Sequence, residues 1–462
     1  MKLKYFLLPG LLALGLSSCG EGFFEQYPSN NITEGNFYKT DDDFNQGVVS
    51  CYAKLKTQMS FHLTEIGYRG DENVLESMAV STQNRYDIDH FAETANNGIL
   101  NDIWNAWYNG IYRCNDVLDH MTGAKIANYD KYRGECLFMR SWWYFNLYRV
   151  FGVVPVTRTV VAPAAAKLIP RCTEEEMYTL LTEDLAEAAR LLPSTPGAEK
   201  ARVANIAAYT LLAKVYLTFG KPAEAKTVLE EAMKNTAYGL ESTTKKAFDV
   251  GNKMNKEIIF ALYYNKTNDN GHGYWYSANT DVMADIRNPT PEFKAIYDSE
   301  KDNRLPLIST YTKIKDNLFA MTKWYDTYDA TYTTQVGNDF PHLRYADVVL
   351  MYAEALAESG GSLGDALTWL NKTRTRAGLD ELTTDEVKSL AEFRSELAAE
   401  RGREFALEGH RWFDLVRLGL AVDYFRGLGY SLDSHNLIFP IPQDQIEIVN
   451  NPSILWQNPG FN

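Results

Sequence analysis

Apolar side chains recur every three or four residues over long stretches of this chain, the spacing that places them on one face of an α-helix. This pattern predicts successive helices between about residues 37 and 235, among them 101–120 and 129–148. At the start of this region Thr40 precedes three aspartates. A threonine cap followed by acidic residues favours a helix N-terminus, because both interact with the exposed N–H groups there.

Two pairs of predicted helices carry similar packing positions. The first pair covers 202–219 and 222–233, with a glycine between the helices and alanines on the second. The second pair begins at Tyr345, has apolar residues at helical spacing to Leu356, and continues on a helix around 366–370. Small residues let helices approach closely, as in tetratricopeptide repeats, and glycine ends a helix. The turns differ in length, which indicates divergent repetition.

Between about residues 240 and 340 the helical periodicity fades, and Tyr, Trp, Asn, Thr and Gly become frequent. Residues 257–264 form a short apolar run that ends in two tyrosines, which predicts a strand. We therefore expect an irregular, loop-rich subdomain mounted on the helical scaffold.

The first residues have the order of a secretory signal. Two lysines precede an apolar run from 5 to 16, and Leu16-Ser17-Ser18-Cys19 follows. The run is too short to span a bilayer, and no later segment has 18 consecutive apolar residues. The last four residues resemble a bacterial lipobox, which predicts a signal peptide at 1–18, acylation of Cys19 and a lipidated tether at 19–36.

Composition excludes several classes of function. The chain has 462 residues, of which 45% are hydrophobic and 23% charged, the balance of a globular protein with one large domain or two ordinary ones. Its net charge of −14 repels phosphate backbones, so nucleic acid is not an expected partner. Cys51, Cys114, Cys136 and Cys172 form neither a disulfide framework nor a zinc motif. Two of them, Cys114 and Cys136, each lie 11 residues from a predicted turn near 125 and could face each other. The sequence leaves open whether they form a disulfide or remain two buried free thiols.

No motif predicts catalysis, a metal or a cofactor. Gly360-Gly361-Ser362-Leu363-Gly364 matches the nucleophile elbow of hydrolases, but that motif requires a preceding strand. Here an amphipathic helix precedes the motif, so a turn between two repeat helices is expected. The seven histidines lack metal-ligand spacing.

Residues 400–417 are unusually rich in charge. Five pairs of opposite charges stand three residues apart, a spacing that stabilises helices. They are Glu400–Arg403, Arg401–Glu404, Glu408–Arg411, Arg411–Asp414 and Asp414–Arg417. We interpret them as a structural element in which paired charges lie close to the core.

This stretch resembles the "ER-x-EFa-EG-x-RwfDL-x-R" segment of the SusD/RagB family. Further blocks resemble the same family in the same order. They are Asn36-Phe37-Tyr38, 140–155, the helix at 344–355, the segment 371–378, Phe439-Pro440-Ile441-Pro442, Asn451-Pro452 and Gln457-Asn458-Pro459-Gly460.

The resemblance implies a mainly α fold of four helix pairs similar to tetratricopeptide repeats, plus an irregular ligand-facing region with short strands. It implies one domain over 37–462, with a scaffold at about 37–235 and 342–420, the loop-rich region at 240–340 and a C-terminal segment at 421–462. It also implies a non-catalytic, surface-exposed lipoprotein of the outer membrane that delivers glycans to a SusC-like TonB-dependent transporter. One departure is that only Glu21 supplies an acidic residue directly after Cys19, where many surface-exported relatives have several.

The family binds ligands through variable loops, so physical chemistry selects the candidate contacts. Sugar rings stack on aromatic side chains while their hydroxyls need polar partners. Candidates in polar, non-periodic stretches are Arg85, Tyr86, Asp87, Tyr274, Trp275, Tyr276, Trp324 and Tyr325. For each residue, core packing or a transporter contact is the alternative. A peptide-capturing member of the family, a helical-repeat scaffold for other proteins and a hydrolase are the competing functions.

Overall fold

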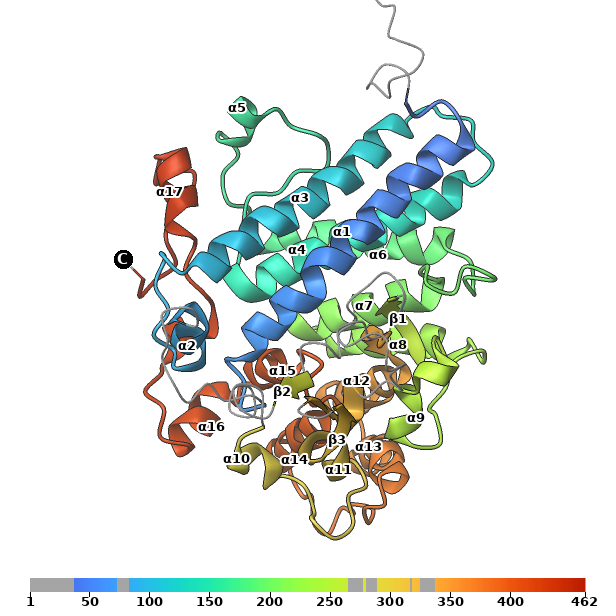
Figure 1. The fold of residues 1–462 in the computed structure, drawn as a ribbon, viewed down its shortest axis with the longest axis vertical. Coiled ribbons are helices and arrows are strands. Elements are labelled where there is room, and N and C mark those ends of the chain that lie inside the picture. The colour runs from blue at the N-terminus through green and yellow to red at the C-terminus, as the bar shows by residue number, and fades with distance from the viewer. Residues whose placement is uncertain are drawn as a thin grey trace, which may run out of the picture.

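The computed structural model describes residues 37–72, 83–264, 277–279, 289–315, 318–324 and 337–461. These residues form a mainly helical fold with two small sheets, as expected (Figure 1). Cys19, Tyr274, Trp275, Tyr276 and Tyr325, all named from the sequence, lie outside the described residues.

The scaffold is a series of long helices in which chain neighbours pack against each other (Figure 1). Its members are α1 (Asp41–Gly67), α3 (Gly98–His120), α4 (Tyr129–Phe151), α6 (Glu174–Leu191), α7 (Asn205–Thr218), α8 (Pro222–Met233), α12 (Tyr345–Glu358), α13 (Leu363–Arg376) and α14 (Leu390–Glu404). The pairs α7–α8 and α12–α13 are the two that the sequence predicted, and α12 also packs on α8. Their likeness to tetratricopeptide repeats stays a prediction.

Short helices connect and flank this scaffold. They are α2 (Gln83–Asp89), α5 (Pro163–Ala166), α9 (Thr244–Ala247), η2 (Val250–Asn252), α10 (Pro291–Lys294), α11 (Leu305–Ser309), η4 (Thr322–Trp324), α15 (Arg411–Arg417), α16 (Ala421–Gly427), η5 (Ser434–Leu437) and α17 (Gln443–Val449). The described parts of the region 240–340 therefore consist of short elements, as its irregular composition indicated.

Local sequence signals fix several boundaries. The Asp43 N–H donates to Thr40 Oγ1 (3.2 Å) and the Thr40 N–H donates to Asp43 Oδ2 (2.7 Å), so the predicted start of α1 is confirmed. Ser362 accepts a hydrogen bond from the Asp365 N–H at the start of α13. The hydrolase-like motif is thus a turn between two helices, as expected.

The strand predicted at 257–264 is confirmed as β1 (Ile258–Leu262), which pairs antiparallel with β5 (Phe340–Arg344). Both strands are buried along their whole length, which explains the continuous apolar run. A second sheet has the order β2-β4-β3, formed by Ser277–Asn279, Leu318–Met321 and Tyr311–Lys315.

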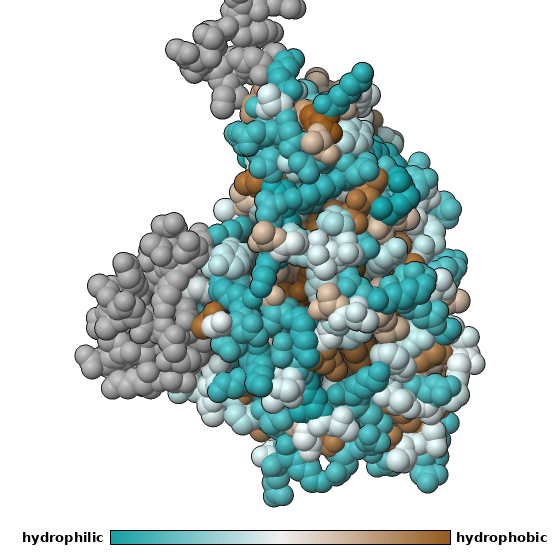
Figure 2. All heavy atoms as spheres, turned by 90° about the vertical axis from the view of Figure 1, so that its right-hand side faces the viewer, coloured by the Kyte–Doolittle hydropathy of each residue, from teal (hydrophilic) through white to brown (hydrophobic). Residues whose placement is uncertain are grey.

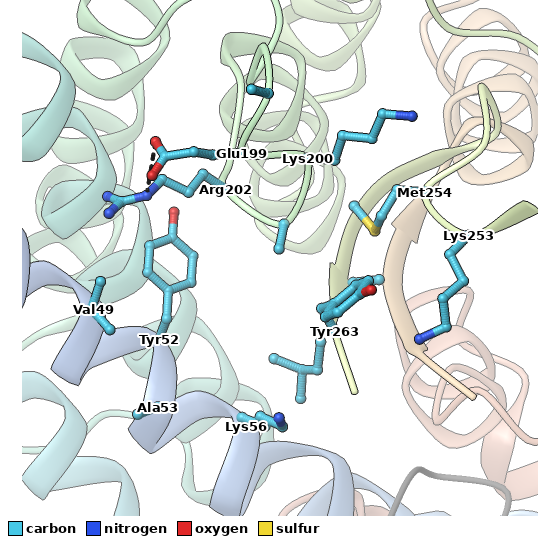
Figure 3. A pocket seen from close by; sticks show the side chains of 14 residues that line it. Val49, Tyr52, Ala53, Lys56, Glu199, Lys200, Arg202, Lys253, Met254 and Tyr263 are labelled. Carbon is cyan, nitrogen blue, oxygen red and sulfur yellow. Dashed lines mark ion pairs between the residues drawn. The ribbon is translucent and has the colours of Figure 1, made fainter. Parts of the chain in front are cut away.

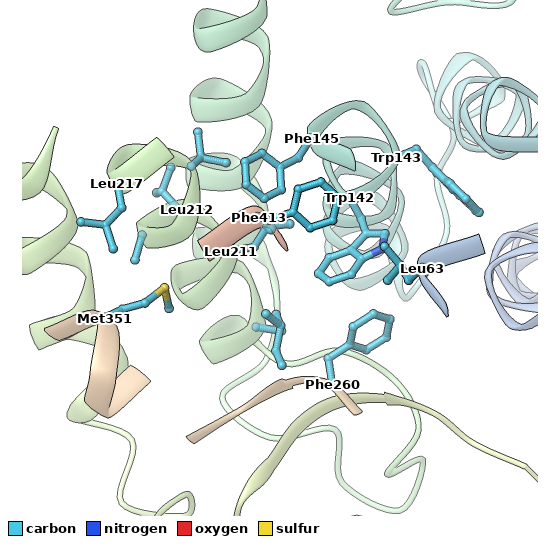
Figure 4. Close-up of a cluster of buried hydrophobic side chains, with 14 of the residues drawn as sticks. Leu63, Trp142, Trp143, Phe145, Leu211, Leu212, Leu217, Phe260, Met351 and Phe413 are labelled. Carbon is cyan, nitrogen blue, oxygen red and sulfur yellow. The ribbon is translucent and has the colours of Figure 1, made fainter. Parts of the chain in front are cut away.

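The core lies where helices and β1 meet. Trp142 and Phe145 of α4 face Leu211 of α7, Phe260 of β1 and Phe413 of α15 (Figure 4). By contrast, the face of the molecule shown in Figure 2 is mostly hydrophilic, with small, separate apolar areas. The hydrophobic and polar positions read from the sequence are therefore segregated as a globular fold requires.

Three cysteines meet inside this core. Cys114 of α3 and Cys136 of α4 lie on packed helices, as the turn near 125 predicted, and the thiol of Cys51 on α1 lies near both. All four cysteines in the described residues are buried and free. The alternative of buried thiols is the one that the structure contains.

Residues 400–417 do not form one helix, which corrects the sequence interpretation. Helix α14 ends at Glu404 and α15 begins at Arg411. Between them the chain turns through two residues with positive φ, Leu407 (64°) and Gly409 (75°). This turn lies between Glu408 and Arg411, so that predicted pair cannot form as one within a helix.

Two of the five predicted ion pairs exist, Glu400–Arg403 and Asp414–Arg417. The other three are wrong, because their members pair with distant residues. Arg401 pairs with Asp347 and Asp414, Arg411 pairs with Asp71, Glu408 pairs with Lys323 and Arg344, and Glu404 pairs with Arg304, Arg344 and Arg376. The charges are buried, as expected, but they join α14 to the rest of the fold rather than stabilising one helix.

Candidate functional site

An open pocket of about 680 Å³ lies between α1, the loop before α7 and the end of β1 (Figure 3). Helix α1 presents Val49, Tyr52, Ala53 and Lys56 to it. Counted from Val49, the other three stand three, four and seven residues further along, so all four share one face of the helix. The helical periodicity of α1 therefore builds one wall of the pocket.

Tyr52 is fixed by the loop before α7. Its hydroxyl accepts a hydrogen bond from the Val203 N–H (3.1 Å). Burial, together with the nearby Glu135 carboxylate, raises the pKa of the Tyr52 hydroxyl well above its ordinary value. The side chain is consequently a neutral phenol whose ring and hydroxyl are held in place.

Tyr263, directly after β1, forms the opposite wall of the pocket (Figure 3). Its side chain is 45% exposed, whereas that of Tyr264 is buried. The Lys253 Nζ lies 4.2 Å from the centre of the Tyr263 ring and forms an ion pair with Asp339 (2.7 Å). An exposed ring held beside a cation can accept a flat apolar face while the cation binds a polar group.

Met254, which also lines the pocket, has a φ of 49°, in the left-handed region that non-glycine residues rarely adopt. Its neighbour Asn255 holds this conformation. The Asn255 side-chain amide donates to the Ala247 carbonyl (3.1 Å) and accepts from the Glu257 N–H (3.0 Å). Strained backbone that is fixed in this way concentrates at binding sites.

Charged groups form the rim on the α7 side. Arg202 pairs with Glu135 (2.7 Å) and Glu199 (3.3 Å), and Lys200 is exposed beside them. Burial raises the pKa of Glu135 to about 7 against the opposing effect of Arg202. The pocket thus offers two tyrosine rings surrounded by hydrogen-bond donors and acceptors.

This arrangement suits reversible binding of a polar ligand with flat apolar faces. Within the described ranges, no group of three or more His, Cys, Asp or Glu side chains is placed to hold a metal ion. In that same part of the chain, no helix has the length and apolar character needed to cross a membrane.

The predicted residues Arg85, Tyr86 and Asp87 lie on α2, which packs against α3, and none of them lines the pocket. All three are half-buried. Tyr86 stacks on His90 with 3.8 Å between ring centres, and Asp87 accepts a hydrogen bond from Gln83 (2.6 Å). These residues therefore form a surface separate from the pocket.

The location of Trp324 differs from the sequence prediction of an exposed stacking ring. Its side chain is 1% exposed and packs against Phe248 and Phe340, with ring centres 5.2 and 6.3 Å away. The polar residues around it in the sequence suggested a loop, but η4 folds the ring onto β5. Trp324 belongs to the core of the structure.

Tyr52 and Tyr263 were not selected from the sequence. Tyr52 stands in a helical pattern, and such aromatic residues were assigned to the core. Tyr263 and Tyr264 end a strand, and neighbouring strand residues point to opposite sides. Two adjacent tyrosines at a strand end therefore carried a signal that one ring faces outward.

Two family models match this chain, one described as "SusD family" over residues 303–461 and one as "Starch-binding associating with outer membrane" over 28–217. SusD-like protein P2 of Formosa agariphila is 26% identical, covering 99% of this chain and 100% of that protein. Starch-binding protein SusD of Bacteroides thetaiotaomicron is 33% identical over 154 residues, which are 31% of this chain and 26% of that protein.

Solved structures share the fold. A SusD-like protein from Bacteroides fragilis aligns with a TM-score of 0.79 at 21% identity, covering 93% of this chain and 98% of that one. A laminarin binding SusD-like protein aligns with a TM-score of 0.75 at 22% identity, covering 92% and 100%. The helical scaffold of this chain is therefore the fold of these structures. The chain belongs to the SusD/RagB family, as the sequence motifs indicated.

Proposed function

We propose that this protein binds glycans reversibly at the cell surface, without catalysis, and delivers them to a SusC-like TonB-dependent transporter. The observation that carries the proposal is the open pocket between Tyr52 and Tyr263, on a fold shared with glycan-binding proteins. Structures of that fold include a laminarin binding protein and surface glycan-binding protein A from Bacteroides uniformis.

Glycan chemistry fits this pocket. A sugar ring stacks its CH-rich face on an aromatic side chain, and its hydroxyls exchange hydrogen bonds with charged groups. Tyr263 supplies the exposed ring, while Lys253, Lys200 and Glu199 supply donors and an acceptor within the same pocket. A shallow site of this kind gives a Kd on the order of micromolar to millimolar, which suits a protein that hands its ligand onward.

Residues named from the sequence remain proposed as additional contacts. Tyr274, Trp275, Tyr276 and Tyr325 are candidates for stacking in the loop-rich region. Arg85, Tyr86 and Asp87 on α2 are candidates for a separate contact with an extended oligosaccharide.

Tyr263→Ala should weaken binding of a recognised glycan about two- to twelvefold, because one stacking contact contributes about 0.5–1.5 kcal/mol. The melting temperature should stay close to that of the parent protein, since the ring is nearly half exposed. Isothermal titration calorimetry against a panel of soluble glycans measures the change.

The matched control is Tyr112→Ala on α3, where the tyrosine is equally exposed (46%) but does not line this pocket. It should bind as the parent does. Unchanged affinity in the Tyr263 variant would place the glycan elsewhere, and binding of peptides in place of all glycans would favour the peptide-capturing function.

We also propose that Cys19 carries a lipid that anchors the protein to the outer membrane. Cys19→Ala should move the protein out of the membrane fraction, as immunoblotting of fractions would measure.

From cells with the parent protein, mild-detergent pull-down should co-purify a β-barrel transporter of about 100 kDa, the size expected for the family. Membrane retention of the variant contradicts the anchor, and recovery of the lipoprotein alone contradicts the partner.

A further inference from the structure

The segment 158–170, which connects α4 to α6, exposes aliphatic side chains at the surface. From 160 to 170 it contains one charged residue, Lys167, among valine, alanine, proline, leucine and isoleucine. Leu168 is 70% exposed, and Val160 and all four residues of α5 are also exposed. A continuous apolar segment on the outside of a protein marks an interaction site rather than a solvated loop.

Hydrogen bonds hold this segment in place. The Val160 N–H donates to Asp119 Oδ2 (2.7 Å), and Asn115 Nδ2 donates to the carbonyl of Thr159 (3.1 Å). An antiparallel bridge between Pro155 and Arg171 closes its base. The side chains of Val160, α5 and Leu168 are therefore presented outward by a fixed backbone, whereas Val161 and Ile169 are half-buried.

The segment lies at the end of the molecule where the N-terminal tether joins the domain. The Tyr38 hydroxyl donates to Asp116 Oδ2 (2.7 Å), and its ring stacks on His120 with 4.4 Å between ring centres. Asp116, Asp119 and His120 belong to the last turns of α3, so the start of the domain and Val160 are held by the same part of one helix. In Figure 1, α5 and the first turn of α1 both lie toward the upper end of the long axis.

We infer that residues 158–170 rest on the lipid surface that holds the anchor, an inference that depends on the proposed acylation of Cys19. The composition favours lipid over a protein partner. Protein interfaces concentrate Tyr, Trp and Arg at their centres, whereas residues 160–170 present short aliphatic side chains. The one arginine, Arg158 at the edge of the segment, pairs with Glu183. Lys167 can keep its ammonium group among lipid headgroups while its stem lies along the apolar surface. The tether keeps the segment close to the membrane, so weak insertion suffices.

The test places an environment-sensitive fluorophore on the lipidated full-length mature protein. Leu168→Cys supplies the attachment site, and the four native thiols in the described domain are buried. Ile448→Cys on α17 is the matched control, because Ile448 is also exposed (51%) but lies outside the segment. On vesicles of phosphatidylethanolamine and phosphatidylglycerol, the label at 168 should show blue-shifted emission that a lipid-borne quencher suppresses. The label at 448 should show neither effect.

Equal emission and quenching at 168 and 448 would overturn the inference. A blue shift that occurs only after the transporter is added would assign the segment to a protein contact and would also overturn it. So would a shift in the absence of vesicles that grows with protein concentration, because it would indicate a contact between two copies. Mass spectrometry of Cys19 and glycan titrations of the same labelled proteins test the anchor and the proposed function separately.

Discussion

Replacing Arg344 by alanine should lower the free energy of unfolding by about 3–5 kcal/mol, the effect of removing one member of a buried ion cluster. The Arg344 guanidinium contacts Glu257 (2.8 Å), Glu404 (2.6 Å) and Glu408 (2.8 Å), and all four side chains are buried. Without Arg344 these carboxylates lose a shared counter-charge in a place that water does not reach.

The pKa of Glu404 shows how much these carboxylates depend on their partners. Burial alone would raise it, but the charges of Arg376, Arg344 and Arg304 hold the pKa of Glu404 well below its ordinary value. Glu404 is therefore ionised in the folded protein and requires the surrounding guanidiniums. The cluster joins β5, α13 and α14 to Glu257, which lies 87 residues from Arg344 in the sequence.

Urea unfolding of Arg344→Ala and of Arg394→Ala provides the comparison. Arg394 also donates two hydrogen bonds to one carboxylate, that of Glu358, but this pair is partly open to solvent. Loss of this pair should lower the free energy of unfolding by less than about 1 kcal/mol. Equal effects of the two substitutions would show that the buried cluster contributes no more than a surface pair.

Trp324→Ala should destabilise the protein by about 3–5 kcal/mol, as expected for removing a large aromatic side chain from a core. The ring packs between elements on two sides, since Phe248 follows α9 and Phe340 begins β5. Its removal would leave a cavity that the surrounding strands and helices cannot fully close. Thermal and chemical unfolding measure the loss.

The control for this substitution is Trp456→Ala, in which the same residue type is removed from a partly exposed position in the C-terminal segment. It should cost clearly less, because a smaller apolar area returns to water. If Trp324→Ala kept the parent's stability and lost glycan binding, the ring would be a ligand contact, as its sequence neighbours first suggested.

Local patterns in the sequence were sufficient to predict much of the helical scaffold. The helices at 101–120 and 129–148, the two pairs around 220 and 360, the start of α1 and the strand β1 all follow from periodicity, caps and breakers within a few residues. The family motifs were also readable, because each is a contiguous block. These signals depend only on neighbouring residues, so they can be recognised without knowledge of the fold.

The partners of the charges and the location of the aromatic rings depended on tertiary structure. Arg344 and Glu404 are 60 residues apart, and Arg401 and Arg411 pair with Asp347 and Asp71 instead of with the residues three positions along. Similarly, Tyr52 and Tyr263 meet across one pocket from α1 and the end of β1. Periodicity states which face of an element is apolar, but not which distant element covers it. Long-range packing therefore decided that Trp324 is buried, that Tyr263 is open and that Val160, α5 and Leu168 stay exposed.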